Sequence, residues 1–599
     1  MIDAISKIFS QEQITQAKQL YEGLTDEQRF WLSGYLAGLN QTGGFLNGAL
    51  QKNGSAAHGT NGTPNVAVAN KLSIIYGTHT GNSKLIAEKF SALAEAKGIE
   101  VSLCSMPEYK NRKLKEEKNL LVIVSTHGEG DPPASAEDFY SYIFGKKAPK
   151  VNDLNFAVIA LGDSSYINYC QTGRDIFNQL KTLGSTDVHE LIELDIDFKE
   201  QLGQILPNLA NKFASINGSA VNIATTAANL DFDSDKWVEV EVLDKTLLNG
   251  KGSNKKTYHI ELDIEDTGIS YLPGDALEIQ ADNDDKLVLA ILLKLNIKES
   301  EVINIDGNQI NVKEALKTKY EITTITAPVL KKYAEFAKND KLSAILEDTS
   351  KLADFLYGLD FLDLLTDFPA PLKATDLPTL LRKLPARVYS ISSSYDYNPD
   401  EVHVTVSAVK YHLNNREHLG VCSSFLADRI NIGDHVSVRV KKNEGFRLPA
   451  NDAKLIMVGP GTGIAPFRSF LQQRENDEAS GDNWLFFGDQ HFETDFLYQT
   501  EMLHLRKKGL LSDIDVAFSR DQEDKIYVQH RLQEKGEKVY KWLEEGAYFY
   551  LCGDMRNMAK DVKAELLNII EQHGSKTKEE ANAYLKNLTA EKRFQEDVY

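Results

Sequence analysis

The chain has 599 residues, too many for a single hydrophobic core, so we expect several domains. Its formal net charge of -20 argues against nucleic acid and anionic membrane surfaces as partners, and 42% hydrophobic with 26% charged residues is typical of globular proteins. Because it has no long apolar run, no signal-peptide pattern and only four cysteines without a C-x-x-C pair, we expect a cytoplasmic protein with no membrane span, metal site or iron–sulfur cluster.

The N-terminal region is predicted to be a helical segment over residues 1–40. Residues 41–70 are rich in Gly, Asn, Ala and Thr, and are predicted to form a flexible linker. Apolar side chains recur at helical spacing near the end of the helical segment: Phe30, Trp31, Leu32, Tyr35 and Leu36. Such a patch needs to be buried, either in another subunit or in its own domain, and we expect this segment to assemble a homo-oligomer.

Strands alternate with helix-length segments over residues 71–213. This alternation predicts a doubly wound parallel sheet. The four candidate strands are residues 72–76, 119–126, 156–163 and 188–195. Residues 214–235 consist mostly of small and polar residues, and are predicted to be a hinge linker.

Short runs of alternating polarity follow in two segments, residues 236–282 and 376–447, and predict an antiparallel barrel. A helical insertion over residues 283–375 separates them. Strand–helix alternation returns over residues 448–599, which predicts a second α/β domain. The expected fold class is therefore multidomain α/β with an inserted antiparallel barrel.

The loop after the first strand reads GTHTGNS, residues 77–83. A helix N-terminus leaves backbone N–H groups unpaired and therefore suits a phosphate. The hydroxyls of Thr78, Thr80 and Ser83 could add donors, or Asn82 or Ser83 could merely cap the helix. This stretch alone does not decide between the two readings.

Two further loops leave the same sheet edge, where open α/β sheets bind ligands. They offer two rings, His127 and Tyr166, that could flank a flat heterocycle. Together the three loops closely resemble those of flavodoxin-like domains, although His127 stands where many diflavin reductases have Tyr. The resemblance implies bound FMN. The matching positions are Thr78, His79, Thr80, Gly81, Asn82, Ser83, Ser125, Thr126, His127, Gly128, Leu161, Gly162, Asp163, Ser164, Ser165, Tyr166, Ile167, Asn168, Tyr169 and Cys170.

An ordered series of motifs follows in the second half: RVYSISSS, TVSAVKY, GVCSSFL, GPGTGIAPFR, SRD, KIYVQ and CGD. A lone glycine-rich turn is weak evidence, but this one follows a strand and opens a helix. The series resembles the ferredoxin–NADP reductase family over residues 236–599. For FAD, the resemblance implies Thr323, Arg387, Val388, Tyr389, Ser390, Thr405, Val406, Ser407, Tyr411, Gly420, Val421, Cys422 and Ser423.

The same resemblance implies NADPH as the nucleotide. A guanidinium that binds the 2′-phosphate is the physical reason to expect NADPH rather than NADH. The matching positions are Gly461, Thr462, Ser519, Arg520, Lys525, Ile526, Tyr527, Val528, Gln529 and Asp561.

Three polar residues match the family's hydride-transfer point: Ser390, Cys552 and Asp597. They would stabilise charge that changes on nicotinamide and flavin. Tyr599, the last residue, would stack on the flavin and move aside when nicotinamide enters. Without the resemblance, a terminal Tyr would be expected to fray.

A flavodoxin module joined to this reductase module defines the diflavin reductase family, which covers about nine-tenths of the chain. Within it, the RFQEDVY ending, the lack of an anchor and the helical start are most similar to flavoproteins of bacterial sulfite reductases. That resemblance implies electron flow from NADPH through FAD and FMN to a haemoprotein subunit. Two alternatives stay open: a diflavin reductase for another acceptor such as a cytochrome, and a flavin-binding scaffold. A candidate docking face is acidic: Glu129, Asp131, Glu137 and Asp138.

Overall fold

The computed structural model describes residues 71–78, 80–128, 130–216 and 236–599. The predicted helical segment 1–40, the linker 41–70, residues 217–235 of the predicted hinge, His79 and Glu129 lie outside the described residues. Within the described ranges, every helix is too short or too polar to cross a bilayer.

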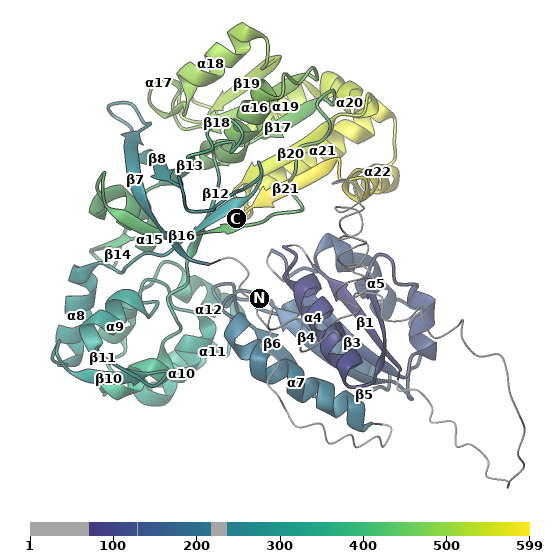
Figure 1. The fold of residues 1–599 in the computed structure, drawn as a ribbon, viewed down its shortest axis with the longest axis vertical. Coiled ribbons are helices and arrows are strands. Elements are labelled where there is room, and N and C mark those ends of the chain that lie inside the picture. Colours follow the sequence, from purple (N-terminus) through teal and green to yellow (C-terminus); the bar gives the residue numbers. More distant parts are fainter. Residues whose placement is uncertain (1–70, 79, 129, 217–235) are drawn as a thin grey trace, which may run out of the picture. The chain divides into compact units, whose positions relative to one another are not determined.

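The first sheet has the strand order β2-β1-β3-β4-β5, with β6 also paired to β4, and all its pairs are parallel (Figure 1). This is the order of doubly wound sheets of the flavodoxin type. The strands are β1 (Lys71–Gly77), β2 (Glu100–Ser105), β3 (Asn119–Ser125), β4 (Asn155–Leu161), β5 (Thr186–Asp187) and β6 (Ile192–Leu194).

Two strands of this sheet differ from the sequence prediction. The prediction missed β2, an edge strand whose residues are only half-buried and do not form a strong apolar run. Of the strand predicted over 188–195, only β6 (Ile192–Leu194) forms, and the two-residue strand β5 (Thr186–Asp187), which the prediction missed, comes before it. Both differences lie at the edges of the sheet, where burial imposes the weakest pattern.

Helices cover both faces of this sheet. Phe90 of α4 and Phe213 of α7 lie in the hydrophobic core on one face, whereas Phe139 of α5 and Ile176 of α6 lie in the core on the other. The helices are α4 (Asn82–Ala96), α5 (Glu137–Phe144), α6 (Gln171–Thr182) and α7 (Lys199–Ser215). The three predicted ligand loops all leave the carboxyl edge of the sheet.

The predicted barrel is an antiparallel sheet with the order β12-β9-β16-β7-β8-β13. A bridge between Ile391 and Val404 joins the regions of its two end strands and closes it. The strands are β7 (Val238–Leu247), β8 (Thr257–Asp263), β9 (Ala276–Ile279), β12 (Arg387–Ser390), β13 (Glu401–Ser407) and β16 (His435–Lys441). A hairpin, β14 (Lys410–Leu413) and β15 (Arg416–Leu419), precedes the short helix α15 (Val421–Ser424).

The insertion is mainly helical, as predicted, and has its own hydrophobic core. Its helices are α8 (Asp285–Leu295), α9 (Val312–Thr318), α10 (Ala327–Ala337), α11 (Asp340–Leu346), α12 (Thr349–Leu356), α13 (Phe361–Asp367) and α14 (Leu377–Leu380). A hairpin, β10 (Val302–Ile305) and β11 (Asn308–Asn311), interrupts them.

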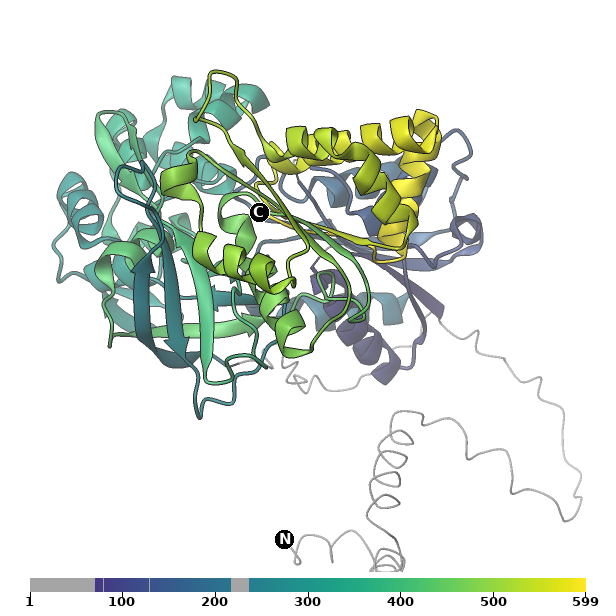
Figure 2. The same cartoon turned by 90° about the horizontal axis from the view of Figure 1, so that it is seen from above.

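The C-terminal domain contains a parallel sheet of order β19-β18-β17-β20-β21. Helices α16 and α18 pack on one face, and α19, α20, α21 and α22 pack on the other (Figure 2). The strands are β17 (Leu455–Val458), β18 (Asn483–Asp489), β19 (Asp513–Phe518), β20 (Tyr548–Gly553) and β21 (Phe594–Val598). The helices are α16 (Ala465–Asn476), α17 (Phe492–Asp495), α18 (Gln499–Lys508), α19 (Val528–Glu534), α20 (Gly536–Glu544), α21 (Met558–Gly574) and α22 (Lys578–Ala590). The predicted fold class is confirmed.

Candidate functional site

The first loop of the flavodoxin-type domain ends at a helix that has no side-chain cap. Gly81 is the N-cap residue of α4, in a left-handed conformation with φ of 86°, and its N–H donates to Thr78 Oγ1 over 2.9 Å. Asn82 and Ser83 lie inside the helix, so the reading in which either one caps it is wrong. The Ser83 Oγ is buried without a hydrogen-bond partner among the described residues. A buried, unpaired hydroxyl at a helix N-terminus fits a phosphate group.

The second loop contacts the first turn of α6, which directly follows the third loop, beside the end of β3. Thr172, on the first turn of α6, donates through its hydroxyl to Gly130 O over 3.4 Å, and its N–H donates to Thr126 Oγ1 over 3.3 Å. The Ser125 Oγ is a second buried hydroxyl without a partner in the described structure. Burial lowers the pKa of His127, so its imidazole is neutral near pH 7. A neutral ring suits contact with a flat heterocycle.

Two predicted flavin-loop residues have side chains in the protein core. Leu161 packs in the core beneath the sheet. Cys170 is fully buried, with its Sγ 3.4 Å from Ala160 O, and burial raises the pKa of its thiol to about 12. At these two positions only backbone atoms can take part in a site at the sheet edge.

A buried carboxylate links two of the predicted FAD residues. Glu321 forms an ion pair with Arg387 and accepts a hydrogen bond from Thr323 Oγ1 over 2.6 Å. Burial opposes its charge, but the Arg387 guanidinium outweighs that effect and the pKa of Glu321 is lowered. Sequence reasoning missed Glu321, because nothing local marks a partner 66 residues from Arg387.

The segment that begins α15 requires glycine at position 420. A Cβ atom on Gly420 would lie 2.5 Å from Ser423 Oγ and 2.9 Å from Val409 Cβ. Ser423 Oγ in turn accepts the N–H of Val409 over 3.2 Å. The Cys422 side chain is buried against Tyr389, and burial raises the pKa of its thiol to about 11. These contacts hold two predicted FAD segments, on β12 and α15, together.

Other predicted FAD residues point in different directions. The Thr405 hydroxyl bonds to Tyr498 OH over 2.7 Å, towards the C-terminal domain, while Val406 lies in the barrel core. The Tyr411 ring stacks on His418, with ring centroids 5.1 Å apart, and its hydroxyl donates to Gly358 O over 2.7 Å. The TVS and KY segments therefore offer a ligand their backbone and one ring rather than a row of side chains.

The three residues predicted at the hydride-transfer point lie together. Ser390 Oγ donates to Asp597 Oδ2 over 2.7 Å, and Cys552 Sγ lies 3.9 Å from the same oxygen. Strand register explains part of this, because Cys552 on β20 and Asp597 on β21 are direct partners. Burial raises the pKa of Asp597 and raises that of Cys552 well above its usual value. The thiol is therefore protonated near neutral pH and is no nucleophile.

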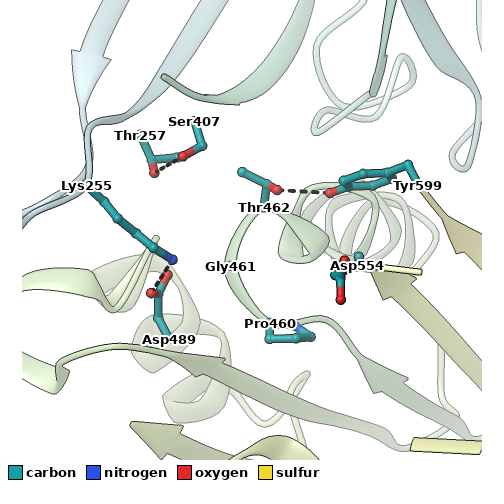
Figure 3. Close-up of a pocket in the computed structure, with 10 residues that line it drawn as sticks. Lys255, Thr257, Ser407, Pro460, Gly461, Thr462, Asp489, Asp554 and Tyr599 are labelled. Atoms are coloured by element: carbon teal, nitrogen blue, oxygen red, sulfur yellow. Dashed lines mark hydrogen bonds and ion pairs between the residues drawn. The ribbon is translucent and has the colours of Figure 1, made fainter. Parts of the chain in front are cut away.

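A pocket opens between the barrel and the C-terminal domain (Figure 3). The GPGTG turn forms one wall, and Tyr599, with its hydroxyl 2.9 Å from Thr462 Oγ1, forms another. Gly463 lets the turn approach β20, because a Cβ there would lie 2.2 Å from Cys552 O. The lining residues are Lys255, Thr257, Ser407, Pro460, Gly461, Thr462, Asp489, Gly553, Asp554 and Tyr599.

Lys255 and Asp489 are pocket residues that sequence reasoning missed. Lys255 Nζ lies 2.5 Å from Asp489 Oδ1, a carboxylate that is almost completely buried at the end of β18. Lysine is common in this chain and the two residues are 234 positions apart, so no local pattern could identify the pair. Of the two, the Lys255 ammonium suits contact with the phosphates of a nucleotide, because it is a cation that lines the pocket.

The residues predicted to read the 2′-phosphate follow β19. Their main chain is fixed, because Ser519 N–H donates to Asp489 O and Arg520 N–H donates to Gln490 O, each over 2.9 Å. No ion pair within the described ranges engages the Arg520 side chain. Gln529 donates to Asp561 Oδ2 over 3.2 Å, so these two predicted residues are neighbours. The arrangement leaves the Arg520 guanidinium available for an anion.

The chain combines a flavodoxin-type domain with a barrel and a second α/β domain of the nucleotide-binding type. The polar trio Ser390, Cys552 and Asp597 lies beside the pocket between the last two. This combination defines a diflavin oxidoreductase. Family models agree: Flavodoxin matches residues 74–204, FAD binding domain matches 230–425, and Oxidoreductase NAD-binding domain matches 457–564. The sulfite reductase (NADPH) flavoprotein alpha-component of Bacillus subtilis is 42% identical over the full length of both chains. The proteins of that name from Aliivibrio fischeri and Serratia proteamaculans are 40% and 38% identical, over at least 98% of each chain.

This chain therefore belongs to the family of sulfite reductase (NADPH) flavoprotein alpha-components. It is an NADPH-dependent flavin oxidoreductase whose cofactors are FMN, FAD and NADPH.

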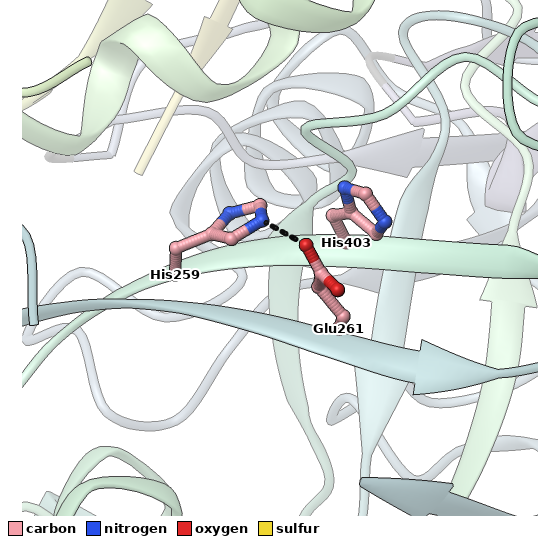
Figure 4. Close-up of side chains that lie close together, drawn as sticks. All are labelled: His259, Glu261 and His403. Carbon is pink, nitrogen blue, oxygen red and sulfur yellow. Dashed lines mark hydrogen bonds and ion pairs between the residues drawn. The ribbon is translucent and has the colours of Figure 1, made fainter. Parts of the chain in front are cut away.

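A buried cluster of titratable side chains lies on the face of the barrel that meets α16 and α18. His259 lies 3.1 Å from Glu261, and His403 stands opposite Glu261 in the strand register (Figure 4). Arg468 donates to His403 Nδ1 over 3.2 Å and to Glu501 over 2.8 Å. The guanidinium thus already supplies a cation here. A second cluster consists of Asp360, Asp363 and His418. There Arg416 supplies the cation, because it pairs with both aspartates and contacts His418.

The histidine cluster predicts that the barrel module loses stability in acid. Burial, followed by the Arg468 charge, lowers the pKa of His259 from 6.5 to about 4 and that of His403 to about 2. Below pH 6.5 the two histidines bind protons in the unfolded chain but not in the folded chain, so the free energy of unfolding falls as the pH drops. For His259 alone the expected loss between pH 6.5 and 4 is roughly 3 kcal/mol.

The measurement is urea unfolding, followed by the fluorescence of released FAD, at pH values from 7 to 4.5. Burial and Glu401 raise the pKa of Glu261, so protonation of Glu261 makes the folded state more stable as the pH falls and opposes the effect of His259. The pH dependence of the wild type is therefore compared with that of His259→Gln, in which Glu261 is still present. That variant should show a flatter pH dependence, whereas the control His435→Gln, at an exposed position, should not. Identical pH slopes for wild type and His259→Gln would contradict the prediction.

Proposed function

We propose that this chain oxidises NADPH and delivers the electrons, by way of FAD and FMN, to the haemoprotein subunit of a sulfite reductase, for the reduction of sulfite to sulfide. The observation that carries the oxidising half is the contact of Ser390 and Cys552 with Asp597 behind the pocket that Tyr599 lines. When they are bound, the three cofactors supply the hydride transfer and the subsequent passage of its two electrons one at a time.

The polar trio controls charge and protons. The Ser390 hydroxyl donates to a carboxyl whose pKa is raised by burial, so Asp597 holds a proton more readily than an exposed aspartate does. Cys552 remains a neutral thiol beside it. In a site with little water, such preorganised dipoles stabilise charge that develops during transfer.

The residue assignments are part of this proposal. The loop of Ser83 would hold the FMN phosphate, which is supported by the buried unpaired hydroxyls of Ser83 and Ser125. The segments joined by Glu321 and by Gly420 would hold FAD. The pocket of Thr462 and Lys255, with the loop of Arg520, would hold NADPH.

The haemoprotein partner is proposed because this chain has no set of thiols for an iron–sulfur cluster. Its four cysteines are on β2, directly before α6, on α15 and on β20: Cys104, Cys170, Cys422 and Cys552. Thiolate ligands for one cluster have to converge. Sulfite would therefore be reduced on another subunit.

The acidic face of the flavodoxin-type domain is the proposed docking surface. Asp131, Glu137 and Asp138 are exposed. Asp138 is not unpaired, however, because Lys586 Nζ lies 2.5 Å from its carboxylate. A basic partner would have to compete with Lys586 for that residue.

Deletion of residues 1–50 tests the assembly and partner proposals together. We expect a monomer that still reduces small dyes with NADPH but supports sulfite reduction poorly when the haemoprotein is added. The reason is that the truncated chain keeps every described residue of the site but loses the apolar patch around Trp31. Size-exclusion chromatography and sulfide formation are the measurements.

The full-length chain is the control. An oligomer of unchanged size after truncation would overturn the assembly proposal. Sulfide formation from NADPH by the purified chain without a haemoprotein would overturn the partner proposal, and efficient reduction of a cytochrome with no transfer to the haemoprotein would favour the other acceptor.

A further inference from the structure

The last residue of the chain is tied to β20 through its backbone. The Tyr599 N–H donates to Gly553 O, and the Met555 N–H donates to Tyr599 O, each over 3.1 Å. The residue as a whole nevertheless remains 55% exposed. The main chain at this position is thus fixed on both sides, and the ring can leave its place most easily by rotation about its own side-chain bonds.

The hydroxyl of that ring has a partner on the facing wall of the pocket. Thr462 Oγ1 lies 2.9 Å from Tyr599 OH, and Figure 3 shows the two side chains pointing toward each other from the GPGTG turn and the chain terminus. The turn is itself fixed against β20, since Gly463 approaches Cys552 O too closely for any side chain. Both partners are therefore anchored to the same strand, and the bond between them restrains the ring rather than the backbone.

We propose that Thr462 is a positioning residue that latches Tyr599 in its place, and that this hydrogen bond has to break before a nicotinamide ring can enter. The proposal rests on the proposed use of this pocket by NADPH. It also bears on selectivity. A nucleotide with a 2′-phosphate gains extra binding at the loop of Arg520, whereas NADH must displace the latched ring without that help.

The expected size of the effect follows from the kind of bond. A hydrogen bond between two neutral, partly exposed hydroxyls contributes little net free energy, so its loss should change the apparent affinity for NADH about two- to tenfold. The change should appear in KM rather than kcat, because the ring competes with nicotinamide for one place and takes no part in the transfer itself.

The test is a double-mutant cycle on the full chain, with Thr462→Val, Tyr599→Phe and both together. NADH-dependent dye reduction is measured alongside the inhibition constant of 2′,5′-ADP, which has no nicotinamide. Each single variant should lower KM for NADH two- to tenfold, and the double variant should lower it no further. Thr462→Ser, which keeps the hydroxyl that bonds to Tyr599, should lower KM for NADH less than Thr462→Val does, and 2′,5′-ADP should bind all four variants equally.

Additive effects of the two single variants would overturn the latch, as would a higher KM for NADH in Thr462→Val, which would show that the contact of Thr462 with the nucleotide outweighs its bond to Tyr599. If Thr462→Val folds poorly, Tyr599→Phe alone decides, since it keeps the ring and removes the bond; an unchanged KM then refutes the proposal. Failure of the wild-type chain to oxidise NADPH is a separate result that refutes the proposed function instead.

Discussion

Replacing Arg520 by alanine is expected to lower kcat/KM for NADPH by roughly one to two powers of ten while kcat/KM for NADH barely changes. A guanidinium–phosphate contact is charge-assisted and worth about 1.5–3 kcal/mol, at about 1.4 kcal/mol per decade. The Arg520 backbone is held by Gln490 O, and no ion pair in the described parts of the chain engages its side chain. It can therefore take a phosphate without giving up another partner. Steady-state kinetics with both nucleotides is the measurement.

Arg506→Ala is the matched control. Arg506 lies on α18 of the same domain, is exposed, and already donates to Ser512 O and pairs with Asp513. Its loss removes the same charge without touching the loop after β19, so the preference for NADPH should not change. Equal losses of efficiency with NADPH and NADH in Arg520→Ala would show that Arg520 does not read the 2′-phosphate.

The layers of the fold were predictable because each leaves a local pattern. Buried strands such as β3 form continuous apolar runs, and barrel strands such as β8 alternate. Strand β2 was missed for the same reason: at the sheet edge, half-exposed residues lose both patterns. The loops after the strands were found because hydroxyl and glycine residues gather there.

The site was only partly predictable, because its contacts join distant segments. Ser390 and Asp597 are 207 residues apart, and only the family resemblance brought them together before the structure did. Two contacts that the family resemblance did not indicate were missed: Glu321 with Arg387, and Lys255 with Asp489. Each is an ion pair across two segments, with one partner buried. Composition and periodicity cannot report such pairs, because they depend on tertiary register.

A fragment of residues 236–599 is expected to keep FAD and to reduce ferricyanide with NADPH, but to lose FMN and most transfer to one-electron protein acceptors. The cores support this division. Buried residues of the first domain's two cores all lie between Leu72 and Phe213, whereas those of the remaining cores lie between Val240 and Phe594. Each part therefore buries its own apolar surface and has what it needs to fold alone.

Released-flavin analysis and parallel assays with ferricyanide and the haemoprotein measure the outcome. A fragment of residues 71–216 is the matched control and should bind FMN but show no NADPH oxidation, because Asp597 and the nucleotide pocket lie in the other part. The contacts between the parts, among them Arg382 with Asp163 and Ile167 against the core of the insertion, lie outside the buried residues of each part's own cores, so breaking them should not unfold either part. If residues 236–599 reduced the haemoprotein at the full rate, the electrons would not need the flavodoxin-type domain, and the proposed order of transfer would be wrong.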